Sequence, residues 1–276
     1  MKKSIVWLAS YPKSGNTWTR IFIANYLANR QEPLPINQIH RFGIGDSIAN
    51  MYHKAAGRQI DVGNVALTVH LRERVLQGVV DNNVDINLMK THNIRKTTHG
   101  VELIPAKFTR SAIYVMRNPL DMVLSYARHY SFTLERAVEV IGHSENANAP
   151  GPKNVAMFLG SWSEHVRSWT SLSPYPHLVL KYEDMLADPH TEFTKVLKHL
   201  GVPVDQERLD RAIEFSSFKE LTRQEADSGF IEKPDNTEKF FSKGQSGQWK
   251  TDLSQDLVDQ ICSDHHHVMK RYGYLE

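Results

Sequence analysis

Short apolar runs alternate with polar turns and with segments of helical periodicity along this chain. Five consecutive apolar residues predict a strand over 5–9, and their continuity suits burial on both faces of a sheet. After a polar turn, apolar residues recur at helical spacing from Thr17, which predicts a helix that continues to about Arg30. The chain therefore opens as strand, tight turn and helix.

Later blocks repeat this order. Strands are predicted over 86–92, 113–116 and 177–182, and helices over 65–80, 189–200 and 254–270. Asn118 and Pro119 suit the N-cap and the first position of a further helix. The weakly patterned stretch 31–85 is interpreted as an excursion from the sheet. We therefore predict an α/β fold, with one domain over 1–276 and a central parallel β-sheet flanked by helices.

Composition excludes several classes of protein. The net charge of +2 over 276 residues is too small to favour bulk nucleic-acid binding. Cys262 is the single cysteine, so an internal disulfide is impossible and a reducing, cytoplasmic location is expected. No apolar run approaches the roughly 18 residues of a membrane span, and the one after Lys3 is short for a signal peptide. We expect neither nucleic acid nor membrane as a partner.

The first turn, Tyr11-Pro12-Lys13-Ser14-Gly15-Asn16-Thr17, suits an anion. Gly15 lets the backbone approach another group closely, and the start of the following helix presents N–H donors and a partial positive charge. The loop is P-loop-like in its physics but not in its letters, because Lys13 precedes Gly15. Phosphate or sulfate is the predicted ligand.

Two groups of histidines lead to different predictions. The strand block 86–92 ends in Lys90-Thr91-His92, which puts His92 at the carboxyl end of the strand, where open α/β sheets place their chemistry. Most of the fourteen histidines are expected to be surface or hydrogen-bonded side chains. His265, His266 and His267 diverge by ~100° each on a helix, so they are predicted to lie at the surface and not to share a metal ion.

Four blocks, in order, resemble the sulfotransferases that use 3′-phosphoadenosine 5′-phosphosulfate (PAPS). The first loop is similar to Y-P-K-S-G-[TN]-T-W, 117–125 to R-[ND]-P-x-D-x-x-x-S, 182–184 to Y-E-D, and 242–250 to R-K-G-x-x-G-x-W-K. The resemblance implies a cytosolic-type enzyme that moves a sulfuryl group from PAPS to a hydroxyl or amine of a small-molecule acceptor. The product nucleotide is then 3′,5′-bisphosphoadenosine (PAP).

The family's functional residues can be carried over by position. The resemblance implies nucleotide binding by Lys13, Ser14, Gly15, Asn16, Thr17, Trp18, Arg117, Ser125, Tyr182, Ser216, Phe218, Lys243 and Gly244. Trp18, Ser216 and Phe218 are candidates for the adenine contact.

The same resemblance implies the catalytic roles. His92 is expected as general base and Lys13 as the group that neutralises the leaving oxygen. Lys90 is expected to contact the phosphosulfate, and Ser125 to hold Lys13 away until the acceptor binds. No metal is needed when lysine and backbone donors supply the electrostatics.

One position departs from the family pattern. Ser242 stands where an arginine is usual, which removes a bidentate contact to the 3′-phosphate unless another cation, such as Arg20 or Lys250, replaces it. The family's dimerisation signature is not recognisable, so a homodimer is left open, and the loop over 142–152 is a candidate lid.

Two other classes stay open. A P-loop kinase would need Mg²⁺ ligands, and a non-catalytic PAP-binding relative would tolerate the loss of His92.

Overall fold

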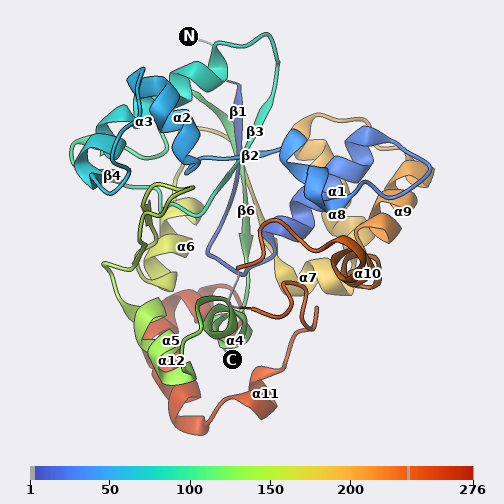
Figure 1. Cartoon of the computed structure of the whole chain (residues 1–276). Coiled ribbons are helices and arrows are strands. Elements are labelled where there is room, and N and C mark those ends of the chain that lie inside the picture. The colour runs from blue at the N-terminus through green and yellow to red at the C-terminus, as the bar shows by residue number, and fades with distance from the viewer. Residues whose placement is uncertain (1–3, 235–236, 276) are drawn as a thin grey trace. The chain divides into compact units, whose positions relative to one another are not determined.

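A five-stranded sheet organises the fold. The computed structural model describes residues 4–234 and 237–275. The sheet has the order β2 (Ile44–Gly45), β3 (Asn87–Thr91), β1 (Ile5–Ser10), β6 (Thr109–Met116) and β9 (His177–Lys181). β1 and β2 both pair in parallel with β3, and the β1–β3 register runs from Ile5 opposite Asn87 to Ala9 opposite Thr91. The α/β fold with a central parallel sheet flanked by helices is confirmed (Figure 1).

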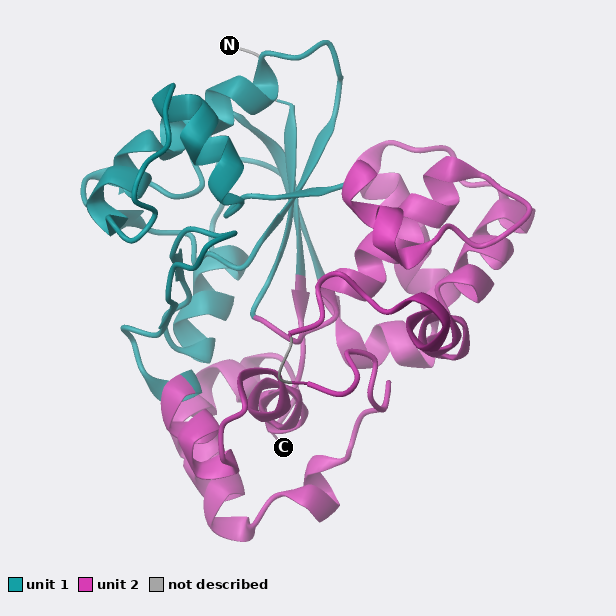
Figure 2. Ribbon diagram, viewed as in Figure 1, with its two compact units in different colours: residues 1–11, 43–114, 141–179 teal, residues 12–42, 115–140, 180–276 magenta. Residues whose placement is uncertain are grey.

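The chain forms two compact units, which Figure 2 colours separately. Unit 1 comprises residues 1–11, 43–114 and 141–179, and unit 2 comprises 12–42, 115–140 and 180–276. Each unit thus draws on three separate stretches of the sequence. The prediction of one domain over 1–276 stays a prediction.

Unit 1 contains most of the sheet and a core rich in aromatic residues. Its helices are α2 (Ala49–Ala56), α3 (Val65–Val80) and α6 (Trp162–Thr170), and its short hairpins pair β4 (Thr97–Thr98) with β5 (Val101–Glu102) and β7 (Ala147–Asn148) with β8 (Met157–Phe158). Helices α2 and α3 pack side by side (Figure 1). Trp162 and Trp169 are at most 1% exposed, which agrees with their helical spacing in the sequence.

Unit 2 is mostly helical. Its elements are α1 (Asn16–Ala28), η1 (Ile36–Arg41), α4 (Pro119–Tyr130), α5 (Leu134–Gly142, up to residue 140), α7 (Tyr182–Ala187), α8 (Pro189–Leu200), α9 (Gln206–Phe215), α10 (Phe218–Ser228), α11 (Trp249–Asp252) and α12 (Gln255–Arg271). Helices α1, α8 and α9 form one group (Figure 1). Phe22 of α1 stacks on Phe193 of α8, with ring centroids 3.8 Å apart.

Most predicted helix ends agree with the structure, but the histidine triplet does not. Asn118 caps α4, and Gly201 ends α8 with a left-handed residue. His266 and His267 are exposed as predicted, whereas His265 is 2% exposed, so its placement at the surface was wrong. His265 lies four residues after Ile261 on the inward face of α12, where the amphipathic pattern overrides its polarity.

Two further predictions concern the loops and the membrane. The candidate lid over 142–152 contains β7, which pairs antiparallel with β8, and its motion stays a prediction. Within 4–234 and 237–275, no helix is both long enough and apolar enough to span a bilayer.

Candidate active site

The loop after β1 has an unusual backbone that explains its glycine. Lys13 and Gly15 both take left-handed conformations, with φ of 67° and 108°, and Gly15 is the N-cap of α1. Left-handed residues in such a turn direct successive N–H groups into a concave site that suits an anion. A Cβ on Gly15 would lie 2.9 Å from Tyr182 Cδ2 and 3.4 Å from Val115 Cγ1. The close approach predicted for Gly15 is therefore toward the Tyr182 ring.

Buried polar atoms in unit 2 provide a test of whether this loop fits a ligand. Ser14 Oγ, Trp18 Nε1 and Arg117 Nε are buried and have no hydrogen-bond partner among the described residues. Buried donors of this kind are rare in folded proteins and are usually satisfied by water, an ion or a ligand. A hydroxyl, an indole and a guanidinium together suit the phosphates and the base of a nucleotide.

Arg117, at the end of β6, connects three parts of unit 2. Its guanidinium carbon lies 4.4 Å from the centre of the Tyr182 ring. Nη1 donates to the carbonyl of Lys13 at 3.3 Å and lies 3.5 Å from Ser125 Oγ, and Nη2 donates to the carbonyl of Gln245 at 3.0 Å. With 6% of its surface exposed, Arg117 is held in place by these contacts.

The segment 242–249 is attached to the first turn of α4. Asp121 accepts from Gly247 N at 2.6 Å through Oδ2 and from Trp249 N at 3.1 Å through Oδ1. Gly244 has a φ of 60°, and a Cβ there would lie 2.4 Å from the Phe218 ring. The sequence does not indicate this role of Asp121, because nothing local signals a partner more than a hundred residues away.

A basic hollow lies beside the loop in unit 2. Its lining residues are Lys13, Ser125, Arg128, His129, Thr237, Lys239, Phe240 and Ser242. The Lys13 ammonium stands over the Phe240 ring, 3.9 Å from its centre. Lys243 instead forms an ion pair with Asp252 at 3.0 Å, so its charge is partly neutralised.

The three candidates for the adenine contact, Trp18, Phe218 and Ser216, differ in how much of each side chain is exposed. Trp18 meets Tyr182 and Phe193 edge to face, with ring centroids 5.8 and 5.4 Å apart. Phe218 is 37% exposed, which leaves part of its ring open for stacking. Ser216 is fully buried, and its hydroxyl donates to the carbonyls of its own helix, among them Ala212 O at 2.8 Å.

His92, in unit 1, has a defined tautomer. Its Nδ1 lies 2.8 Å from the carbonyl oxygen of Ser10, and the Ser10 hydroxyl lies 3.3 Å from the same nitrogen. A carbonyl can only accept, so Nδ1 carries the proton and Nε2 is left as the basic nitrogen. Lys90, two residues earlier, is half-buried and pairs in the sheet with Leu8 and Gly45.

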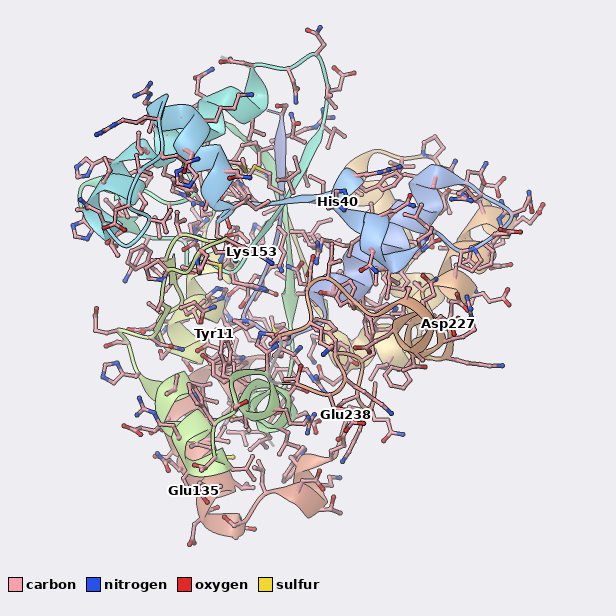
Figure 3. All side chains as sticks on the ribbon, in the orientation of Figure 1. Tyr11, His40, Glu135, Lys153, Asp227 and Glu238 are labelled. Atoms are coloured by element: carbon pink, nitrogen blue, oxygen red, sulfur yellow. The ribbon has the colours of Figure 1, made fainter. Side chains whose placement is uncertain are left out.

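The backbone of His92 is fixed by a buried histidine. His165 Nε2 donates to the His92 carbonyl at 3.0 Å, while its Nδ1 accepts from the Tyr114 hydroxyl at 2.9 Å. Burial lowers the pKa of His165 to about 3, so the ring is neutral. Figure 3 labels Tyr11, which lies beside α6 in the same unit and meets the His165 ring edge to face at 5.3 Å.

The residues on either side of His92 are held by a buried ion pair. Thr91 Oγ1 and Asn93 Nδ2 both donate to Asp46 Oδ2, at 2.7 and 3.0 Å, and Arg72 Nη2 donates to it at 2.6 Å. Burial acts to lower the pKa of Arg72, but the charges and hydrogen bonds of Asp46 and Tyr52 together raise it. Sequence reasoning missed Asp46, Arg72 and His165, since no motif marks them.

The two units divide the predicted site residues between them. Unit 1 contains Lys90 and His92. Unit 2 contains Lys13, Ser14, Gly15, Asn16, Thr17, Trp18, Arg117, Ser125, Tyr182, Ser216, Phe218, Lys243 and Gly244. The predicted nucleotide-binding residues thus belong to one compact unit, although their roles stay predictions.

Solved structures of low sequence identity share this fold. One is mouse sulfotransferase SULT7A1 complexed with PAP, at 19% identity and a TM-score of 0.63, with 98% of this chain and 86% of that chain covered. Another is retinol dehydratase in a complex with retinol and PAP, at 17% identity and a TM-score of 0.67, with 98% and 82% covered.

Sequence comparison identifies the family. Mouse sulfotransferase 1 family member D1 is 26% identical over 268 residues, which is 94% of this chain and 81% of the relative. Human sulfotransferase 1E1 is 26% identical over 280 residues, with 95% and 83% covered. The family model described as the sulfotransferase domain matches residues 3–273. Because this match spans nearly the whole chain, the protein belongs to the sulfotransferase family.

Proposed function

We propose that this protein binds PAPS and transfers its sulfuryl group to a hydroxyl or amine of a small-molecule acceptor. The observation that carries the proposal is the set of buried donors without a protein partner, Ser14 Oγ, Trp18 Nε1 and Arg117 Nε, among the residues described in unit 2. They accompany a loop whose left-handed Lys13 and Gly15 direct N–H groups toward an anion. Family membership and the PAP in two related structures support the same donor.

The nucleotide-binding residues would act as follows. The loop amides and Lys13 would face the phosphosulfate, while Arg117 and Ser125 would face the 3′-phosphate. PAPS, when bound, supplies a sulfuryl group on a good leaving group. The Lys13 ammonium would neutralise the charge that grows there, and Lys90 would add a second cation.

His92 would serve as the general base. Because its Nδ1–H is directed to the Ser10 carbonyl, Nε2 is the nitrogen that would take the proton of an acceptor hydroxyl or amine. The imidazolium that results stays bonded to Ser10 O through Nδ1, which stabilises the charged form. His165 and Asp46 hold the backbone around this ring, so its position is set before an acceptor binds.

The decisive experiment separates catalysis from binding. His92→Ala is expected to lower turnover of a responsive phenol, alcohol or amine acceptor by about 10²–10⁴, which is the usual contribution of a general base. PAP affinity, measured by calorimetry, should stay within about twofold. His190→Ala is a matched control, because His190 is a surface histidine paired with Asp210.

The outcomes distinguish the alternatives. Retention of more than about a tenth of the wild-type rate in His92→Ala would exclude His92 as the base. PAP binding without turnover of any acceptor in the panel would instead favour a non-catalytic relative.

A further inference from the structure

Two guanidinium groups in unit 2 converge on one neutral oxygen. Ser125 Oγ lies 3.1 Å from Nη2 of Arg128 and 3.5 Å from Nη1 of Arg117. Ser125 and Arg128 are three residues apart on α4, so they share one face of the helix. Like charges so close together repel unless an anion lies between them.

No protein carboxylate fills that role among the described residues. Neither Arg117 nor Arg128 forms an ion pair there, and the nearby Asp252 is already paired with Lys243 at 3.0 Å. Partial desolvation, together with the neighbouring charge of Arg117, lowers the pKa of Arg128, while Asp252 opposes this shift. The positive electrostatic potential beside Arg117 and Arg128 therefore favours the binding of an anion between them.

Arg128 also lines the same hollow as Ser242, Lys13 and Lys239. Residue 242, at which an arginine is usual in the family, therefore lines this hollow together with Arg128. Arg20 is a poor substitute, because both oxygens of Glu232 accept from its guanidinium, at 2.6 and 2.8 Å. Lys250 is exposed and lies over the Trp249 ring, 5.9 Å from its centre.

We infer that Arg128 supplies the second guanidinium of the 3′-phosphate subsite, from α4 instead of the loop at 242. The inference rests on the proposed binding of PAP. Its ligand is a phosphate monoester, which Arg117 and Arg128 would bind with two forked donors while Ser125 adds a hydroxyl. Arg128 thus supplies the positive charge that the family's arginine at position 242 would supply, but it does so from α4.

The test compares two nucleotides that differ by the 3′-phosphate. PAP and 5′-AMP are titrated calorimetrically into wild type, Arg128→Gln and the control Arg136→Gln, which removes a surface charge on α5 of the same unit. Arg128→Gln is expected to weaken PAP binding by about ten- to a hundredfold, the value of a charge-assisted hydrogen bond. Binding of 5′-AMP by Arg128→Gln, and of PAP by Arg136→Gln, should change by less than about twofold.

A second variant tests the replacement itself. Ser242→Arg in the Arg128→Gln background should recover most of the lost PAP affinity, whereas Ser242→Arg alone should gain less than about threefold. Equal losses for PAP and 5′-AMP, no loss of PAP affinity, or no recovery in the double variant would each overturn the role of Arg128. Failure of the wild type to bind PAP would overturn the proposed function instead.

Discussion

Acidification is expected to destabilise this protein through a single buried side chain, His165. The ring has no exposed surface, and its neutral form uses both nitrogens, donating to the His92 carbonyl and accepting from the Tyr114 hydroxyl. Burial lowers its pKa from the ordinary 6.5 to about 3. Protonation therefore places a charge where water cannot reach it.

The size of the effect follows from linkage. The unfolded chain takes up this proton near pH 6.5, whereas the folded chain takes it up only near pH 3. Stability from this group is therefore complete above about pH 6.5 and is lost progressively as the pH falls toward 3, at about 1.4 kcal/mol per pH unit. At about pH 5 the loss is about 2 kcal/mol, a large part of the 5–15 kcal/mol typical of a folded protein.

The assay is urea unfolding of wild type and His165→Gln at several pH values. Glutamine keeps a hydrogen-bond donor and an acceptor but does not titrate. A loss of stability that is the same at every pH therefore does not affect the comparison, which depends only on how stability changes with pH. The other thirteen histidines are the same in both proteins, so their contributions cancel in the comparison. Between about pH 4 and 6 the wild-type curve should be steeper by about 1.4 kcal/mol per unit. Parallel curves would refute the buried, neutral state of His165.

Two further predictions address the loop and the reaction class. Gly15→Ala should lower the free energy of unfolding by about 1–3 kcal/mol in thermal unfolding, because it introduces both backbone strain at a left-handed residue and a close contact with the Tyr182 ring. Gly201→Ala is the control for the backbone strain alone, because Gly201 has a φ of 71° and a Cβ there would have no atom within 4 Å. Equal costs in the two variants would show that the contact with the Tyr182 ring is unimportant. Activity with PAPS should be unchanged by EDTA and absent with ATP, whereas a rate that needs Mg²⁺ and consumes ATP would move the protein to the kinase class.

Local features of this protein were predictable from the sequence, whereas distant partners were not. The run over 5–9, the cap at Asn118 and the left-handed Gly15 are each set by a few neighbouring residues. By contrast, Asp46 reaches Thr91 and Asn93 across more than forty residues, and Asp121 reaches Gly247 across 126. Such contacts depend on the completed fold, and a single sequence carries no periodic or motif signal for them.

The interleaved chain of unit 2 has a consequence for biosynthesis. A chain is synthesised from its N-terminus at about 5–20 residues per second, so the Lys13 loop and α1 are made well before their partners. Their partners come much later in the chain. Helices α8 and α9, which pack near α1, belong to 180–276, as do Gln245 and Gly247, which bind Arg117 and Asp121. The apolar face of α1 therefore waits uncovered while most of the chain is translated. The anion-binding loop therefore leaves the ribosome long before the segments that complete it.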